Sequence, residues 1–260
     1  MPVVRDQIGR EVTLINPAQR IVSLVPSITE YLHSLQLNAE VVGLTKFCIH
    51  PDVWYRSKTR VGGTKTPALA AIQDLRPDLI IANKEENRKE DIEVLSGYCA
   101  VYVSDINTLN DALQMMKDIG LLVGRQARAE DIVKRVKEGF ASMPFGKWGT
   151  AAYMIWQDPW MSVGSRNFIH DMLTHGGWEN AFSDVDRYPQ IGIEDIIQRS
   201  PDFVFLSSEP YPFKEMHRAE LQKVLPHSRV YVVDGEMFSW YGSRLLAFPE
   251  YIRKLHLELT

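Results

Sequence analysis

A repeated strand design constrains the fold of this chain more than any other feature of its sequence. Residues 76–81 read RPDLII and residues 200–205 read SPDFVF. In each stretch a Pro-Asp pair separates a helical segment from a short apolar strand, and Pro77 and Pro201 lie 124 residues apart (201 − 77). A proline before a strand is common on its own, so the prediction of two similar halves depends on further matches at the same offset. These are Leu69 with Ile193, Ile72 with Ile196, and Glu85 with Glu209.

Short runs rich in β-branched residues recur along both halves and alternate with helical segments. Polar loops bound each run, as is typical of strands in βαβ units, and we therefore expect an α/β fold with mainly parallel sheets. Ser27-Ile28-Thr29-Glu30 fits a capping box that opens a helix toward Leu37, and residues 66–75 and 192–198 read as helices that stop before a proline. The expected strands cover residues 21–25, 41–44, 78–82, 101–103, 151–155, 203–206 and 230–233.

The longest helical stretch is central. It covers residues 109–122, pauses at Gly124 and resumes over residues 127–141, before Met143-Pro144-Phe145-Gly146 ends it. Charged and apolar residues at helical spacing predict a stiff connector, because a flexible hinge would be rich in glycine, serine or proline. We predict an N-terminal α/β lobe over residues 1–124, a connecting backbone helix over 125–143 and a C-terminal α/β lobe over 144–260. The alternative is one amphipathic helix inside a single domain.

Composition and charge argue against several classes of protein. A net charge of −4 and a pI near 6.0 give no basic surface for nucleic acid. The apolar runs are strand-sized, whereas a membrane span needs about 20 apolar residues. Cys48 and Cys99 are too few for a disulfide framework, and their state stays open. The first residues lack a secretory signal. We expect a periplasmic or lipid-anchored protein if a leader has been removed, and a cytoplasmic one if the sequence is the complete native chain.

Residues that follow the predicted strands are the candidates for ligand binding, because parallel sheets bind ligands beyond the carboxyl ends of their strands. Aromatic side chains there suit a flat macrocycle such as a corrin or porphyrin, and lysines and arginines suit an anionic chelate. Acidic neighbours such as Glu85, Glu86 and Asp158 offset these cations, so the sign of the site stays open. Any one of the candidates is alternatively an ordinary core or surface residue. The predicted ligand-binding residues are Pro26, Ser27, Lys46, His50, Lys65, Lys84, Trp156, Arg187, Tyr188, Glu209, Phe238, Trp240, Tyr241 and Arg244.

The sequence predicts no metal site and no catalytic motif. Cys48 and His50 both carry side chains that bind zinc or iron, but a structural site needs four ligands and no second pair accompanies them. The nucleophile elbow, the phosphate-binding loop and the dinucleotide-binding glycine motif are absent from the sequence. We expect a protein that is not an enzyme and has no cofactor. The alternative is an enzyme that uses a carboxylate pair, such as Glu85 with Glu209, for acid–base chemistry.

Several segments together resemble the class III, or helical-backbone, substrate-binding proteins. The resemblance covers nearly the whole chain and is carried by residues 6–14, 20–30, 60–63 and 75–80 and by the second Pro-Asp strand. The family includes receptors for vitamin B12, haem and ferric siderophores. The resemblance implies two α/β lobes joined by one long helix, a ligand in the cleft between the lobes, no catalysis, and delivery of the ligand to an ABC-type permease. Cobalamin is the first choice of ligand, and a ferric siderophore or haem is the related alternative.

The resemblance also implies a docking surface for the permease. Receptors similar to the vitamin B12 protein present one surface glutamate per lobe to arginines of the permease. The second of these falls on Glu194, and the repeat offset places the first on Ala70 (194 − 124), so one of the two docking carboxylates is missing. We expect a monomer that docks through Glu194. The alternative is a cytoplasmic derivative of the fold that stores, senses or modifies such a ligand without docking on a permease.

Overall fold

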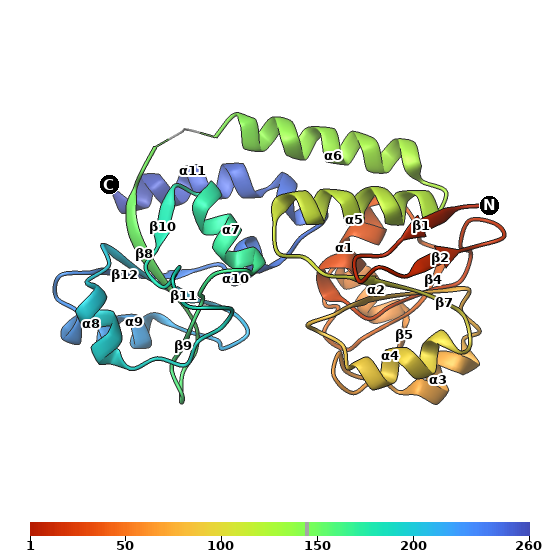
Figure 1. The fold of residues 1–260 in the computed structure, drawn as a ribbon, viewed down its shortest axis with the longest axis horizontal. Coiled ribbons are helices and arrows are strands. Elements are labelled where there is room, and N and C mark those ends of the chain that lie inside the picture. The colour runs from red at the N-terminus through yellow and green to blue at the C-terminus, as the bar shows by residue number, and fades with distance from the viewer. Residues whose placement is uncertain (144–145) are drawn as a thin grey trace. The chain divides into compact units, whose positions relative to one another are not determined.

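The computed structural model describes residues 1–143 and 146–260 and divides the chain into two compact units (Figure 1). Unit 1 contains Met1–Ile106, Asn110–Glu138 and Trp240–Leu246; unit 2 contains Asn107–Leu109, Gly139–Ser239 and Ala247–Thr260. The single-domain alternative is therefore wrong. The units differ from the predicted lobe ranges at Asn107–Leu109 and Trp240–Leu246, because each of these short segments makes its contacts with the unit that is more distant in sequence. The predicted start of the second lobe, at Pro144, lies outside the described residues.

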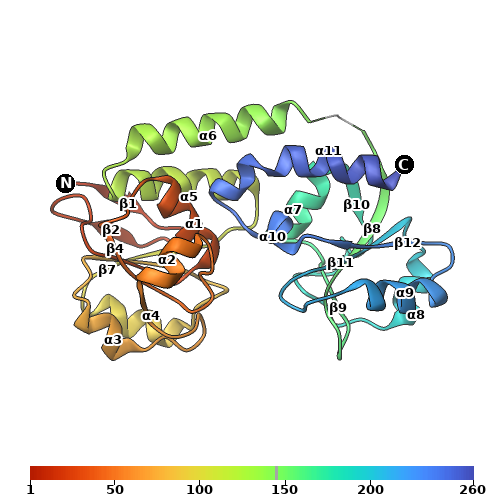
Figure 2. The ribbon, with the colours of Figure 1, turned by 180° about the vertical axis from the view of Figure 1, so that it is seen from behind.

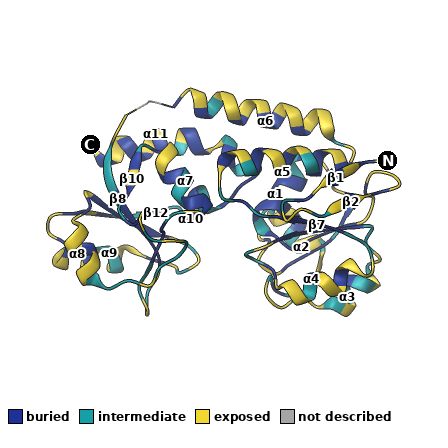
Figure 3. Cartoon of the chain, viewed as in Figure 1, coloured by how far each residue is buried: buried dark blue, intermediate teal, exposed yellow. Residues whose placement is uncertain are grey.

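The sheet of unit 1 consists of five parallel strands. In spatial order they are β5 (Thr59–Arg60), β4 (Val41–Leu44), β3 (Ile21–Ser23), β6 (Leu79–Asn83) and β7 (Ala100–Ser104). Every residue of β6 is buried, as expected for a parallel strand that is covered on both faces. The neighbouring strand β7 is also almost wholly buried (Figure 3). The helices that accompany this sheet are α1 (Pro26–Ser34), α2 (Asp52–Ser57), α3 (Leu69–Asp74), α4 (Lys89–Ser96) and α5 (Leu109–Leu122).

Side-chain alternation along the strands of unit 1 explains which helices cover which face. Ile80 and Ala82 of β6 belong to a core cluster with Ile72 of α3 and Leu95 of α4. On the other face, the Tyr102 hydroxyl of β7 donates to Asp118 of α5 at 3.1 Å. Figure 1 shows α3 and α4 on one side of this sheet and α1 and α5 on the other. The sheet therefore has a helical layer on each face, and its carboxyl edge is left to loops.

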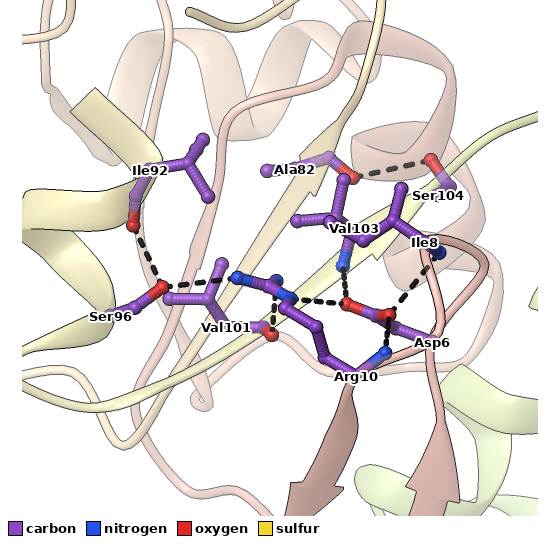
Figure 4. Close-up of polar contacts among 9 residues, drawn as sticks. All are labelled: Asp6, Ile8, Arg10, Ala82, Ile92, Ser96, Val101, Val103 and Ser104. Carbon is purple, nitrogen blue, oxygen red and sulfur yellow. Dashed lines mark hydrogen bonds and ion pairs between the residues drawn. The ribbon is translucent and has the colours of Figure 1, made fainter. Parts of the chain in front are cut away.

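An antiparallel hairpin of β1 (Val3–Arg5) and β2 (Glu11–Thr13) is attached to the outer edge of β7 through the loop between its strands, where the Asp6 carboxylate accepts several of the hydrogen bonds (Figure 4). Asp6 is 3% exposed and accepts hydrogen bonds from the amide of Arg10 (2.7 Å), the guanidinium Nε of Arg10 (2.9 Å) and the amide of Val103 (3.3 Å). The same guanidinium donates to the carbonyl of Val101 at 3.1 Å. These bonds pair polar groups along an edge strand that would otherwise be open.

The sheet of unit 2 has the order β10-β8-β11-β12, with a short strand β9 antiparallel to β8. On one face of the sheet, Val204 and Leu206 of β11 pack with helices α8 and α9. On the other face, Phe203 and Phe205 contact Trp178 of β10, and the helices that cover this face include α7 and α11 (Figures 1 and 2). The strands are β8 (Gly149–Trp156), β9 (Met161–Ser162), β10 (Trp178–Asn180), β11 (Phe203–Ser207) and β12 (Arg229–Val233). The helices are α7 (Phe168–His175), α8 (Ile193–Arg199), α9 (Glu215–Val224), α10 (Gly235–Ser239) and α11 (Phe248–Leu259).

The Pro-Asp repeat has the same structural role in both units. Arg76 and Ser200, the residues before the two prolines, both adopt left-handed backbone with φ of 46°. The Asp78 carboxylate accepts the amides of Gln19 and Arg20 at 2.8 and 2.9 Å, just before β3 begins. Its counterpart Asp202 accepts the amide of Thr150 at 2.7 Å in β8. Each aspartate thus ties the start of its own strand to the start of the neighbouring strand.

The central helical stretch forms two helices, α5 and α6 (Gln126–Ala141). Gly124, with φ of +67°, lies in the turn between them, and a side chain on Gly120 would collide with Ala129 of α6. The predicted range of 109–122 is confirmed, and the predicted range of 127–141 begins one residue late. α6 includes residues of unit 1 up to Glu138 and residues of unit 2 from Gly139.

The predicted capping box at Ser27 is wrong. Helix α1 begins at Pro26, its N-cap is Val25, and no side chain caps it. Proline fixes a helical φ and lacks the amide that a cap would satisfy, so the helix starts two residues earlier than a cap at Ser27 indicates. The same helix ends at Ser34 rather than near Leu37, and α3 begins at Leu69 rather than Thr66.

Candidate functional site

The carboxyl ends of the parallel strands in unit 1 bring most of the predicted ligand-binding residues to one edge of the sheet. Pro26 and Ser27 follow β3, residues 45–50 follow β4, and Lys84 follows β6. The segment Trp240–Leu246 joins this edge from the far end of the sequence. We call this set the unit 1 strand-end surface: residues 24–27, 45–50, 62–65, 83–87 and 240–246.

The loop after β4 presents the most exposed apolar side chains of this surface. Phe47 is 50% exposed and Ile49 is 46% exposed, and the Lys46 ammonium lies 5.1 Å from the centre of the Phe47 ring. The edge of this ring lies over the neighbouring turn, within van der Waals distance of the position that a Cβ on Gly63 would take. Phe47 was missed from the sequence, although it stands between two predicted binding residues. Its signal was an aromatic residue in a loop that directly follows a strand.

His50 and Trp240 contact each other on the same surface. Their ring centres are 5.5 Å apart, at an interplanar angle of 69°. Trp240 is only 7% exposed, and the Arg244 guanidinium lies 5.0 Å from the centre of its ring on another side. Trp240 therefore supports the half-buried His50 rather than offering an open aromatic face.

The predicted cation Arg244 is already paired with a carboxylate. Its Nε and Nη2 atoms each lie 3.0 Å from an oxygen of Glu30 on α1, in the bidentate geometry that guanidinium and carboxylate favour. The two side chains are 15% and 24% exposed. Glu30 was assigned only to a capping box from the sequence, so its role as the counter-ion of Arg244 was missed. The arginine fixes the segment from Trp240 to Leu246 on unit 1.

Tyr241 is buried beside Glu86. Its hydroxyl donates to a carboxylate oxygen of Glu86 at 3.2 Å, and the Ser27 hydroxyl adjoins the same phenol. Burial raises the pKa of Tyr241 well above its ordinary value, and the charge of Glu86 raises it further. The phenol therefore stays protonated. Both Tyr241 and Ser27, at 6% and 3% exposed, form the floor of the surface.

The three lysines that were predicted to bind the ligand differ in their contacts with other residues of unit 1. Lys84 forms an ion pair with Asp105 at 2.5 Å, and the Lys65 ammonium donates to the carbonyl of Glu85. Lys46 extends over Phe47 and is exposed. The unit 1 strand-end surface thus pairs part of its positive charge internally, whereas the Lys46 ammonium lies over a ring and not against an oxygen.

The Cys48 thiol is not available as a ligand. It is fully buried, and the hydroxyls of Thr29 and Thr45 each lie 3.1 Å from its sulfur. Burial raises the pKa of Cys48, which keeps the thiol protonated, although both threonine hydrogen bonds act in the opposite direction. Within residues 1–143 and 146–260 no group of three or more His, Cys, Asp or Glu side chains is placed to hold a metal ion. Both cysteines are free thiols.

The predicted residues of unit 2 lie near the ends of its own strands. Trp156 is 40% exposed at the end of β8, with its ring against Tyr211. Glu209 follows β11 and accepts a hydrogen bond from the Ser239 hydroxyl at 2.6 Å. Arg187 has left-handed backbone, with φ of 59°; its guanidinium donates to Asn107 at 2.9 Å and lies 5.6 Å from the ring centre of Tyr188.

Phe238 is a core residue, so the structure does not support its predicted contact with a ligand. It has no exposed surface and packs against Tyr153 (5.1 Å between ring centres) and Phe248 (5.8 Å). Helix α10 turns this side chain toward the sheet of unit 2, whereas Trp240, two residues later, belongs to unit 1. The predicted position of a ligand between the two lobes stays a prediction.

Glu194 and Ala70 lie on equivalent helices of the two units. Glu194 is in the first turn of α8, exposed, and Ala70 is exposed in the first turn of α3. The neighbouring Asp195 accepts the amide of Gly192 at 2.7 Å and caps α8, so Glu194 is not required for capping. A role for Glu194 in docking stays a prediction.

A family model described as "Periplasmic binding protein" matches residues 21–231 of this chain. The chain belongs to that family. Members of the family are non-catalytic solute-binding proteins, and the predicted identity as a solute-binding protein of an ABC-type importer is confirmed. Within the described parts of the chain, no helix is long and apolar enough to cross a membrane.

Similar proteins agree with this assignment. A vitamin B12-binding protein of Vibrio campbellii is 28% identical over 200 residues, which cover 74% of this chain and 71% of the relative. An uncharacterized ABC transporter substrate-binding lipoprotein of Bacillus subtilis is 24% identical over 94% of this chain and 81% of its own length. The crystal structure of the periplasmic vitamin B12 binding protein of Vibrio cholerae matches with a TM-score of 0.73 at 22% identity, over 92% of this chain and 98% of that one. This last likeness confirms the two-lobed α/β fold.

Proposed function

We propose that this solute-binding protein holds a metal chelate of the tetrapyrrole class, with cobalamin as the first choice, and that its unit 1 strand-end surface contacts the macrocycle. The observation that carries the proposal is the loop after β4, where Phe47 and Ile49 are half exposed beside Lys46 and His50. Exposed apolar side chains next to one accessible cation suit a ligand with a flat apolar face and polar edges. The vitamin B12-binding relatives support cobalamin, and haem-binding structural neighbours support haem as the alternative.

Replacement of Phe47 tests this proposal. Phe47→Ala removes an exposed ring without opening a cavity in the core, so we expect a loss of roughly tenfold or more in cobalamin affinity and little change in stability. Tyr98→Ala is the matched control, because Tyr98 is 63% exposed and precedes β7, at the amino edge of the same sheet. Titration calorimetry measures the cobalamin affinity of both variants. Equal affinity of the two variants would show that the loop after β4 does not contact the ligand.

The protein leaves its ligand chemically unchanged in this proposal, as its family implies. Incubation of the protein with cobalamin, followed by denaturation and mass spectrometry of the released ligand, should return the starting compound. A new ligand mass that depends on native protein would favour an enzyme instead.

Delivery of the ligand to an ABC permease outside the cytoplasmic membrane is the second part of the proposal. It rests on the exposed position of Glu194 and on the lipoprotein and periplasmic relatives. Ala70 favours a second candidate, a derivative of the fold that stores, senses or modifies its ligand without docking, because the equivalent helix of unit 1 has no carboxylate there.

The cognate permease, reconstituted in vesicles, distinguishes these two candidates. If the protein docks, Glu194→Ala should lower its stimulation of ATP hydrolysis by the permease, and Ala70→Glu should leave it equal or raise it. No stimulation by wild-type protein, together with recovery of the native protein from the cytoplasm, would favour the second candidate.

A further inference from the structure

Unit 2 contains a small cavity that the proposed function does not use. Its volume is about 170 Å³, roughly the space that five or six water molecules take up in the liquid. The walls come from the loop after β8, from the first residue of α8 and from one face of α9. The lining residues that matter for its chemistry are Gln157, Trp160, Ile193, Glu220, Leu221 and Val224.

Most of the wall of this cavity is apolar and is held in place by packing. Trp160 stacks on Phe213, with ring centres 5.8 Å apart and an interplanar angle of 8°, so the orientation of the indole is fixed. Leu221 is 4% exposed and belongs with Phe213 to the core cluster of this unit. A ligand of the cavity therefore needs an apolar part that can pack against these side chains.

Two residues of the wall give the cavity its polar character. The side-chain oxygen of Gln157 is buried, and within residues 1–143 and 146–260 it has no hydrogen-bond partner. A buried acceptor without a donor is unfavourable, so a ligand that brings an N–H group gains by supplying one. Glu220, an exposed residue of α9, adds a carboxylate. The neighbouring Arg218 forms its ion pair with Glu215.

We infer that this cavity binds a small organic cation, an ammonium or guanidinium group on a short alkyl stem. The cation supplies N–H donors to Gln157 and a positive charge to Glu220, and the indole of Trp160 also favours a cation. The alkyl stem packs against Leu221 and Val224. The inference goes beyond the proposed function, because it adds a second ligand with a site of its own in unit 2.

NMR titration of the full chain with n-butylguanidinium tests this inference. We expect saturable shifts of the Trp160 indole and Gln157 side-chain signals, with a dissociation constant in the millimolar range, because so small a ligand has little surface to bury. Butylurea has nearly the same shape but no charge, and it should bind more weakly by roughly tenfold or more. Pentanoate, which carries the opposite charge, should not bind.

Two substitutions locate the site. Gln157→Met removes the acceptor at nearly constant volume, so it should weaken binding of butylguanidinium by roughly tenfold without loss of protein stability. Glu220→Gln should weaken binding by roughly fivefold. The matched controls are Gln198→Met and Glu179→Gln, at exposed positions of unit 2, and both should bind the probe as the wild type does.

Three results would overturn the inference. Absence of saturable shifts in the wild-type protein would mean that water alone fills the cavity. Equal affinity for butylguanidinium and butylurea would contradict recognition of a cation, and unchanged affinity in Gln157→Met would contradict the site. Titration of Glu220→Gln with cobalamin keeps this test apart from the proposed function. Its cobalamin affinity should equal that of the wild type, and a parallel loss would show that the cavity is not a separate site.

Discussion

At the scale of single residues, the ion pair between Arg244 and Glu30 helps to hold a seven-residue segment on unit 1. The segment 240–246 is flanked on both sides by residues of unit 2, yet it is part of unit 1. Gly242, with φ of +97°, lies close to Tyr31 of α1, where an added side chain would meet the tyrosine at 3.0 Å. The guanidinium and this glycine together hold Trp240 behind His50.

Glu30→Gln should destabilise the protein by about 1–3 kcal/mol, because it leaves a partly buried guanidinium without its carboxylate. Urea unfolding measures this change in free energy. The control is Glu250→Gln, which breaks an exposed pair with Arg253 and should change stability by about 0.5 kcal/mol or less. Equal effects of the two substitutions would mean that the Arg244 pair contributes no more than an exposed one.

The same segment shows where prediction from sequence stops. Phe238 and Trp240 are two residues apart, both are aromatic, and both follow a predicted strand, so the sequence gives them the same role. The structure places Phe238 in the core of unit 2 and Trp240 against His50 in unit 1. The different positions of Phe238 and Trp240 depend on the direction of α10 and on Glu30, which is distant in sequence. Neither can be recognised in the residues around position 240. Phe47, by contrast, lies in a loop that the strand pattern already predicted to contain ligand-binding residues.

At the scale of elements, the parallel strands were predictable because both of their faces are buried, which gives continuous β-branched runs. The ends of helices were less predictable. Helix α1 begins with a proline where the sequence predicted a serine cap. The Pro-Asp turns contain left-handed residues, Arg76 and Ser200, and these could not be predicted because neither position is a glycine.

The attachment of the β1-β2 hairpin to β7 should depend on Asp6. Asp6→Ala removes a buried carboxylate that accepts several hydrogen bonds, and we expect a loss of about 2–4 kcal/mol in the free energy of unfolding. Hydrogen exchange should also become faster at Val103. Glu11→Ala, on the exposed side of β2, is the control and should have little effect. A fully stable Asp6→Ala variant would contradict this account of the edge strand.

Unit 2 should lose stability in mild acid because of His256 on α11. Its Nε2 lies 2.9 Å from the carbonyl oxygen of Gly176, its ring stacks on Trp148, and burial lowers its pKa despite that hydrogen bond. A lowered histidine pKa means that the unfolded chain binds the proton more readily. The stability that neutral His256 contributes is therefore present above its unfolded pKa of about 6.5 and is lost as the pH falls toward its folded value.

Chemical unfolding between pH 7.5 and 5 measures this effect. Wild-type protein should lose more stability over this range than His256→Phe, which cannot take up the proton. His227→Gln, at an exposed position, should behave as wild type. An unchanged pH dependence in His256→Phe would show that another group is responsible.

At the scale of the whole molecule, two α/β units built on the same Pro-Asp turn form the framework, and function depends on what the strand-end loops carry. The repeat and the order of segments were sufficient to predict the two-lobed fold and the family. The chemistry of the site was less predictable, because Arg244 and Lys84, two of the predicted cations, are neutralised by partners far away in sequence.

Titration calorimetry of the wild-type protein with cobalamin, haem and ferric siderophores tests the central claim most directly. The account predicts saturable binding of one of these metal chelates, with cobalamin first, at micromolar or lower concentration. No heat from any of them at micromolar concentration would contradict it.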